Sequence, residues 1–122
     1  DQLFGNGGDD ALFGGTGDDR LFGGDGDDLI YGERGRDQAY GGAGADTFAF
    51  VDGDQQLYIR DFEADDVVEI SGFDGISDYD DLVNVANLRD SNGRVIVDID
   101  DDRLLIADLT VAELDRDAFV FV

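Results

Sequence analysis

Residues 5–49 read GNGGDDALF GGTGDDRLF GGDGDDLIY GERGRDQAY GGAGADTFA, a nine-residue phrase repeated five times. The units begin at Gly5, Gly14, Gly23, Gly32 and Gly41, and the segment Asp1–Phe4 has the form of the end of a preceding unit. Every unit carries Gly at positions 1 and 4, Asp at position 6 and an apolar residue at position 8. The position-8 residues are Leu12, Leu21, Ile30, Ala39 and Phe48. A fixed short period of this kind predicts a solenoid built from repeated steps.

Each unit divides into a turn and a short strand. Glycine reaches positive φ at little cost, so the Gly-rich positions 1 to 6 predict a tight turn. Positions 7 to 9 predict a strand whose middle residue points inward while its neighbours point outward. Two units then complete one coil, with turns on alternate edges. The expected fold is all-β, with a right-handed parallel β-roll over residues 1–50, since parallel crossovers are almost always right-handed.

Residues 51–122 lose the period and are expected to form a β-rich C-terminal cap, continuous with the roll, with one or two short helices. Strands are expected at 57–59, 67–70, 94–99, 104–107 and 118–122, with turns at Asn92-Gly93 and Asp100–Asp102. Ser77 and Thr110 are each followed three residues later by an acidic residue, which is the capping-box pattern that opens a helix. Solenoids need caps to close their ends. The Asp98-x-Asp100-x-Asp102 spacing resembles an EF-hand loop but lacks its Gly and Glu, and is interpreted as a hairpin turn.

The composition excludes several functions. The 31 acidic and 8 basic residues give a net charge of −23, which opposes compaction and makes nucleic acid and anionic membranes poor partners. There is no Cys or His, so the chain has no disulfide, thiolate nucleophile, typical zinc site or Ser-His-Asp triad. No apolar run approaches the ~20 residues that span a bilayer, so no membrane insertion is expected. No cleavable N-terminal signal is visible.

The spacing of the position-6 Asp residues predicts calcium binding. Coils stack ~4.8 Å apart, so each Asp lies near its counterpart in the next coil. The expected pairs are Asp1/Asp19, Asp10/Asp28, Asp19/Asp37 and Asp28/Asp46. Facing carboxylates repel unless a cation lies between them, and Ca²⁺ takes carboxylate and carbonyl oxygens. A solvated acidic linker is the alternative, but five units in strict register with an apolar position argue against it.

The units resemble the RTX family of hemolysin-type calcium-binding repeats. Ala45–Phe48, Ile59–Phe62, Leu109–Leu114 and Asp117–Phe121 are similar to the C-terminal region of serralysin-type proteases and other type I secreted bacterial proteins. The resemblance implies a non-catalytic module that folds on calcium after type I secretion and stabilises a larger extracellular protein. Its implied partners are calcium ions, an N-terminal parent domain outside this chain, and a type I secretion machine that reads an uncleaved signal within residues 51–122.

In that family each ion lies between two stacked turns. The earlier turn gives carbonyls from positions 2 and 4, the later turn gives those from positions 1 and 3, and both give the position-6 Asp. Carried over, the first site comprises Asn6, Gly8, Asp10, Gly23, Asp25 and Asp28. The second comprises Gly15, Gly17, Asp19, Gly32, Arg34 and Asp37, and the third Gly24, Gly26, Asp28, Gly41, Ala43 and Asp46. Asp1, Gly14, Thr16 and Asp19 form a partial site.

Two departures from the family pattern bear on these sites. Glu33, Arg34 and Arg36 stand in the fourth unit where other units have small or acidic residues, and Glu33 must adopt a turn geometry that Gly accepts more easily. Leu57 stands where the family often has an Asp, so the pattern does not support a further site there.

Two other surface features have alternative interpretations. The aromatic residues at position 9 form two expected ladders, Phe4/Phe22/Tyr40 and Phe13/Tyr31. Cross-strand packing is the simpler role; a contact surface for a parent domain, another copy or a sugar polymer is the alternative. Arg34, Arg36 and Arg60 are either charge balance or a patch for an anionic polysaccharide. The latter would make the chain a carbohydrate-associated module, like the repeat modules of alginate epimerases.

Overall fold

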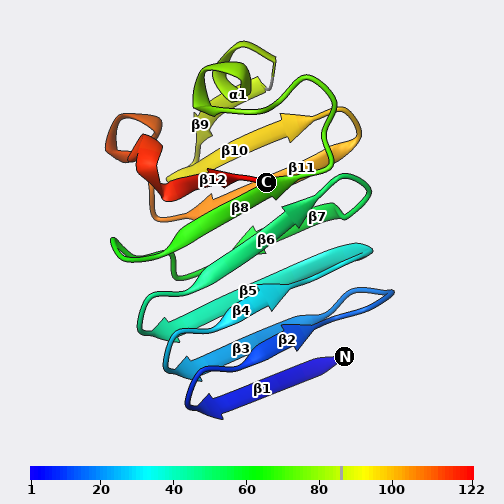
Figure 1. Cartoon of the computed structure of the whole chain (residues 1–122), viewed down its shortest axis with the longest axis vertical. Helices are drawn as coiled ribbons and strands as arrows, with labels where there is room; N and C mark the ends of the chain where they lie inside the picture. The colour runs from blue at the N-terminus through cyan, green and yellow to red at the C-terminus, as the bar shows by residue number, and fades with distance from the viewer. Residues whose placement is uncertain (86) are drawn as a thin grey trace.

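The computed structural model describes residues 1–85 and 87–122, and Ala86 lies outside the described residues. The chain forms stacked coils with one sheet on each side (Figure 1). One sheet has seven strands in the order β1-β3-β5-β7-β11-β10-β9, and the other has five in the order β12-β8-β6-β4-β2. The strands of the roll are β1 (Gln2–Gly7), β2 (Ala11–Phe13), β3 (Arg20–Asp25), β4 (Leu29–Tyr31), β5 (Gly35–Ala43) and β6 (Thr47–Val51).

The register of the strands follows the repeat. Leu21 pairs with both Leu3 and Ala39 across one parallel sheet, and Ile30 pairs with both Leu12 and Phe48 across the other. Each pairing joins residues eighteen apart, so two nine-residue units make one coil, as the period predicted. The position-8 side chains fill the interior, and all five are buried. The expected all-β parallel roll is confirmed.

The stacking continues beyond the repeats. Strands β7 (Gln55–Ile59) and β8 (Val67–Ser71) add a further step to each sheet, and β11 (Asp102–Ala107) and β12 (Phe119–Phe121) pair parallel to them. β11 also forms the predicted hairpin with β10 (Arg94–Ile99) around Asp100, whose φ is +54°. Strand β9 (Asn87–Ser91), which the sequence did not predict, pairs antiparallel with β10 across the predicted Asn92-Gly93 turn.

Within the described residues, the second half contains three short helical segments: α1 (Tyr79–Val85) and the 3₁₀ turns η1 (Val111–Glu113) and η2 (Arg116–Ala118). The capping box predicted at Thr110 is present, because its Oγ1 accepts a hydrogen bond from the Glu113 N–H and donates one to the Glu113 carboxylate. The cap predicted at Ser77 is displaced by one residue. Asp78 accepts the N–H of Asp81, and Ser77 donates hydrogen bonds from its N–H and its Oγ to the Asp81 carboxylate. No helix of the described residues is long and apolar enough to span a bilayer.

Candidate metal centre

The turns of the repeat share one backbone conformation. Position 2 has positive φ in every unit, including the two that are not glycine, Asn6 at +78° and Glu33 at +66°. Glu33 therefore accepts the left-handed geometry that its unit demands, at the conformational cost that a non-glycine residue carries there. The fourth unit keeps the turn shape of its neighbours despite its side chains, and its main-chain carbonyls remain available as oxygen donors.

The position-6 carboxylates form a ladder on each edge of the roll. The Oδ1 atom of Asp28 accepts the backbone N–H of Asp10 at 2.7 Å, and Asp46 accepts that of Asp28 at 2.9 Å. On the other edge Asp37 accepts the N–H of Asp19 at 2.9 Å. Each of the three Asp pairs predicted for complete sites is thereby joined, with the later Asp turned toward the earlier turn.

The second oxygen of each ladder carboxylate lacks a partner. The Oδ2 atoms of Asp10, Asp19, Asp28, Asp37 and Asp46 are all buried, and none hydrogen-bonds with a described residue. An unpartnered buried carboxylate oxygen is costly, because it loses its hydration and gains nothing in return. Five such atoms at equivalent positions mark a feature of the repeat that a bound cation would satisfy.

The glycines at position 1 provide the space beside these oxygens. A Cβ on Gly5 would lie 2.5 Å from the carbonyl oxygen of Gly23 and 2.7 Å from Oδ2 of Asp10. The same space beside Gly14 is bounded by the Gly32 carbonyl at 2.5 Å and Asp19 Oδ2 at 3.0 Å. A carboxylate of one turn and a carbonyl of the next coil therefore converge on a place that only glycine leaves open.

The third predicted site has the same arrangement. Oδ2 of Asp28 and the Gly41 carbonyl oxygen, the latter at 2.5 Å, bound the space beside Gly23. Asp28 thus borders two successive spaces between stacked turns on one edge. Its Oδ1 faces the turn of Asp10, and its Oδ2 faces the turn of Gly41.

The remaining predicted carbonyl donors lie at the same contacts between coils. Carbonyl oxygens of positions 2 and 4 lie against the glycines of the following turn, as Asn6 does against Gly24 and Gly8 against Gly26. Gly17, Gly24 and Gly26 make the same contact with the next turn, and Gly15 accepts the N–H of Arg34. The position-3 carbonyls of Asp25, Arg34 and Ala43 each accept one N–H from the preceding turn. A carbonyl has two lone pairs, so these bonds leave each oxygen able to bind a cation.

The partial site at Asp1 shows the same backbone contact as the complete sites. The backbone nitrogen of Asp1 contacts Oδ1 of Asp19, while the Asp1 side chain is 89% exposed. Gly14 lies beside Asp19, and Thr16 forms an isolated bridge with Arg34. The structure therefore joins Asp1 to Asp19 as it joins Asp10 to Asp28, through the backbone nitrogen of the earlier residue and Oδ1 of the later one.

Burial makes the ladder electrostatically unfavourable without a cation. Desolvation, with smaller contributions from Asp19 and Asp18, raises the pKa of Asp37 to about 6. Desolvation and the carboxylates of Asp66 and Asp28 likewise raise the pKa of Asp46 to about 6. No three acidic side chains of the described residues converge on one point. The donor set instead combines carboxylates with main-chain carbonyls, which suits a hard cation such as Ca²⁺.

Sequence reasoning missed the continuation of the first edge. Asp66 accepts the N–H of Asp46 at 2.9 Å, in the way Asp46 accepts that of Asp28, and is 2% exposed. Asp61 binds the N–H groups of Gly41 and Gly42 at 2.8 and 3.0 Å. The spacing from Asp46 to Asp66 is twenty residues instead of eighteen, which hid the relation. The signal was an Asp directly before an apolar strand, as in the repeats.

Two buried carboxylates tie the second edge to the cap. Asp102, at the start of β11, accepts the N–H groups of Gly53 and Gln55 at 2.7 Å each. Asp54 lies between those two residues, and its pKa is raised to about 7 by burial and, less strongly, by Asp102 and Asp37. These side chains fix the loop that follows the last repeat. The ladder itself ends on this edge at Asp37, because the residue paired with it in the next coil is Leu57, as the sequence indicated.

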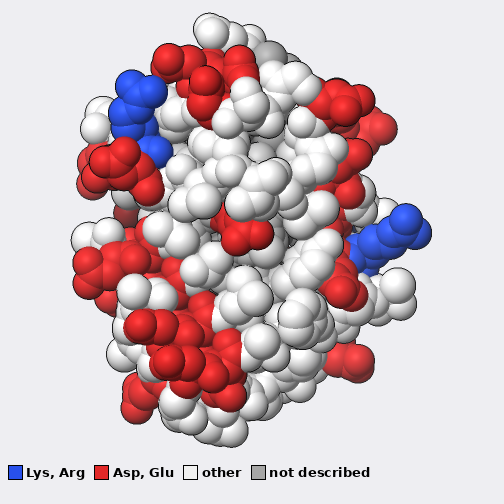
Figure 2. All heavy atoms as spheres, viewed as in Figure 1, with Lys and Arg blue, Asp and Glu red and all other residues white. Residues whose placement is uncertain are grey.

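Acidic side chains gather along the edges of the roll on the face shown in Figure 2. Four ladder residues, Asp19, Asp28, Asp37 and Asp46, are buried, so most of this visible charge comes from other acidic residues. At position 5, Asp9, Asp18 and Asp27 are exposed and their Oδ1 atoms accept backbone N–H groups of the next coil. Position 5 therefore stabilises the stack while remaining hydrated.

Comparison with known proteins supports this interpretation. A model of the RTX calcium-binding nonapeptide repeat, in four copies, matches residues 1–21 and 13–48. No curated protein sequence matches the chain. Among solved structures, the AlgE6R2 subunit of the Azotobacter vinelandii mannuronan C5-epimerase is 27% identical with a TM-score of 0.72, over 99% of this chain and 87% of that one.

The extracellular lipase LipA from Serratia marcescens has the same fold, at 20% identity and a TM-score of 0.65 over 94% of this chain. The chain spans only 20% of that lipase. RTX repeats bind calcium, and this function agrees with the unpartnered carboxylate oxygens along both edges. The family whose model matches residues 1–48 of this chain is thus the RTX calcium-binding nonapeptide repeat.

Proposed function

We propose that this chain is a calcium-dependent folding module of a larger bacterial protein that is exported by a type I machine and acts outside the cell. The observation that carries the proposal is the row of five buried Oδ2 atoms without a hydrogen-bond partner. The similarity to part of an extracellular lipase supports the location. The module itself performs no catalysis in this proposal, and any activity lies in the parent domain.

Three ions would lie between stacked turns. The first is held by Asp10 and Asp28, the second by Asp19 and Asp37, and the third by Asp28 and Asp46, each with the four main-chain carbonyls assigned to that site. Bound Ca²⁺ supplies the positive charge that lets neighbouring buried carboxylates ionise together. The chain's own residues do the rest: glycines leave the space open, and Oδ1 hydrogen bonds fix each carboxylate.

Calcium would also decide whether the chain folds. A net charge of −23 resists compaction. Each ion contributes ~2.7 kcal/mol at a hundredfold excess over its Kd, so three contribute ~8 kcal/mol, which is comparable to the whole stability of a typical domain. Low cytosolic calcium would keep the chain unfolded for export, and higher extracellular calcium would fold it and disfavour its return.

Circular dichroism and calorimetry test this proposal on the same chain. We expect β structure and three bound ions in millimolar calcium, and loss of most β signal when a chelator removes the metal. Magnesium at equal concentration is the control, because its small octahedral shell fits a carbonyl-rich site poorly. A circular dichroism spectrum that does not change on addition of chelator would contradict the proposal.

A second candidate function is a carbohydrate-associated module of a polysaccharide-modifying enzyme. It is supported by the 27% identity and near-complete coverage shared with a subunit of a mannuronan C5-epimerase. The two functions are compatible, because calcium would order the coils and their outer faces would remain free to bind a polymer. Self-assembly through the aromatic ladders is less well supported: Phe4, Phe22 and Tyr40 stack on one another at 4.9 and 4.7 Å, which is the cross-strand packing role.

A further inference from the structure

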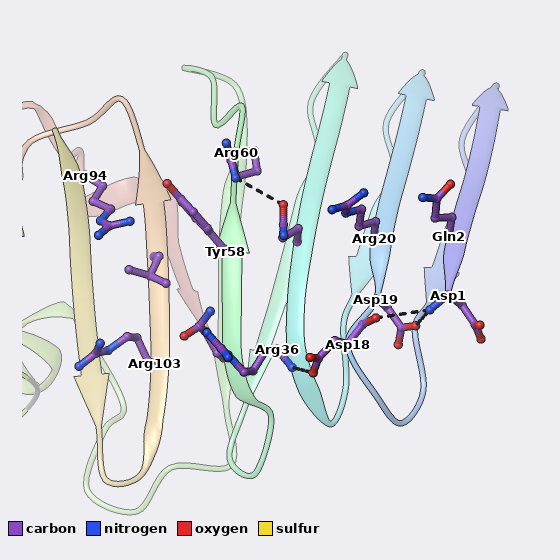
Figure 3. A pocket seen from close by; sticks show the side chains of 13 residues that line it. Asp1, Gln2, Asp18, Asp19, Arg20, Arg36, Tyr58, Arg60, Arg94 and Arg103 are labelled. Atoms are coloured by element: carbon purple, nitrogen blue, oxygen red, sulfur yellow. Dashed lines mark hydrogen bonds and ion pairs between the residues drawn. The ribbon is translucent and has the colours of Figure 1, made fainter. Parts of the chain in front are cut away.

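The outer face of the seven-stranded sheet concentrates the few basic residues of the chain. Five of the eight arginines line one open groove of about 760 Å³, together with glutamine side chains and Tyr58 (Figure 3). The arginines are Arg20, Arg36, Arg60, Arg94 and Arg103. We call this surface the arginine groove. In a chain with 31 acidic residues, such a concentration on one face calls for a physical reason.

Strand register arranges the groove in rows that cross the coils. Arg20, Gln38 and Tyr58 occupy paired positions on β3, β5 and β7. Arg36 and Gln56 pair two residues earlier on β5 and β7, and Gln56 also pairs with Arg103 on β11. Adjacent strands are ~4.8 Å apart, so the four steps from Arg20 on β3 to Arg94 on β10 cover ~19 Å. The groove therefore fits an extended chain that lies across the strands.

Most of these arginines have no acidic partner. Within the described residues, the side-chain ion pairs of arginine involve Arg89 and Arg103 with Asp98, and Arg116 with Asp80. Arg20, Arg36, Arg60 and Arg94 make no such pair with any described residue. A free guanidinium in a strongly acidic protein could pair with a neighbouring carboxylate at little cost. Four guanidinium groups that instead line one groove remain available to an external anion.

Tyr58 holds two of these groups in place. The guanidinium carbon of Arg60 lies 4.6 Å from the centre of the Tyr58 ring, and that of Arg94 lies 5.8 Å from it. Arg60 also donates a hydrogen bond to Gln38, and the Nε atom of Arg94 is buried without a partner. Cation–π contacts restrict both side chains, so an anion that binds there pays less to order them.

We propose that the arginine groove binds a linear polysaccharide that carries a carboxylate on its sugar units, a polyuronate. Guanidinium groups bind carboxylates through paired hydrogen bonds, and the glutamine amides between them suit sugar hydroxyls. Asp1, Asp18 and Asp19 also line the groove, and Asp98 pairs with Arg103 beside it, which disfavours the denser charge of a phosphate polymer. This proposal specifies the ligand of the second candidate function. It rests on the first candidate function only because the groove requires coils that calcium has folded.

Calorimetry with a mannuronate octasaccharide, at fixed free calcium, tests the proposal. We expect saturable binding that weakens at least tenfold in the double variant Arg60→Gln/Arg94→Gln and severalfold in Arg20→Gln. A mannuronate disaccharide is too short to reach both ends of the groove, so Arg20→Gln should not change its binding. Arg116→Gln is the matched control, because Arg116, like Arg34, is exposed and lies outside the groove; the affinity of this variant should stay within twofold of the parent chain.

Calcium stoichiometry of each variant is measured separately, so a failure of the ion sites is distinguished from a failure of the groove. A neutral octasaccharide such as maltooctaose should not bind. The proposal is overturned if the calcium-loaded chain gives no saturable binding, or if the groove variants and Arg116→Gln behave alike. Tighter binding of polyphosphate or a single-stranded oligonucleotide than of the octasaccharide would also overturn it.

Discussion

Replacing Asp28 by alanine should remove more calcium than replacing Asp10. Oδ1 of Asp28 accepts the N–H of Asp10, and its Oδ2 lies beside Gly23 and the Gly41 carbonyl, so it borders two proposed ions. Asp10 borders one. With calcium at a hundredfold excess over Kd, loss of two ions costs ~5 kcal/mol and loss of one ~3 kcal/mol. The lost acceptor for Asp10 N–H adds ~1 kcal/mol to the Asp28 variant.

Calorimetry for the number of bound ions, and urea unfolding at fixed excess calcium, measure the two parts of this difference. Asp27→Ala is the matched control, because Asp27 is exposed, lies next to Asp28, and bonds to the Ala45 N–H without bordering a proposed ion. It should keep all three ions and lose only ~1 kcal/mol. Equal calcium loss in Asp10→Ala and Asp28→Ala would refute the shared-ligand arrangement.

Gly23→Ala should also lose calcium, because its Cβ would lie 2.5 Å from the Gly41 carbonyl oxygen and against Asp28 Oδ2; Gly7→Ala, where a Cβ meets nothing within 4 Å, is the calorimetric control. Without calcium, the pKa of Asp46 is raised to about 6 and that of Asp54 to about 7, above the usual 3.8. Folding then takes up protons, so the metal-free fold is most stable below ~pH 4 and loses stability as pH rises through about 6 to 7. Circular dichroism in chelator should show more β structure at pH 5 than at pH 8, and the reverse order would contradict it. Deleting residues 110–122 removes β12 from the end of its sheet and the proposed export signal, so calcium-induced folding should need more calcium and export by a type I system should cease. Undiminished folding and export of the truncated chain would show that both assignments are wrong.

The repeat allowed the roll to be predicted because its local and long-range constraints coincide. The same turn recurs every nine residues, and identical turns stack on one another. The period therefore determines both the strand register and the set of side chains that point inward. Ala39 shows how strong this constraint is. It is a small residue in a position that otherwise holds larger apolar side chains, yet it is fully buried and pairs with Leu21 and Ile59.

The second half was less predictable because its strands find partners that are distant in sequence. The pairing of β11 with β7 joins Arg103 to Gln56, and nothing in the local pattern fixes that register. Strand β9 contains Asn87, Arg89 and Asp90, whose polarity gives it no hydrophobic period, and among the described strands it pairs with β10 alone. Asp66 was not recognised for a different reason. A loop longer by two residues moves it out of the eighteen-residue spacing, but its carboxylate still accepts the N–H of Asp46, as a ladder Asp does.

The pair of adjacent Asp residues in the early units has a structural explanation that the calcium sites alone do not supply. Position 6 accepts an N–H from the preceding coil, as Asp28 does from Asp10, whereas position 5 accepts one from the following coil, as Asp27 does from Ala45. Each of these turns is therefore hydrogen-bonded to both neighbouring coils, to the preceding one by its position-6 side chain and to the following one by its position-5 side chain. Arg36 and Ala45 replace Asp at position 5 in the last two units, where the next coil departs from the repeat. The Asp at position 5 is thus retained where an equivalent turn follows and lost where none does. This pattern assigns position 5 to coil stacking and leaves the ions to position 6.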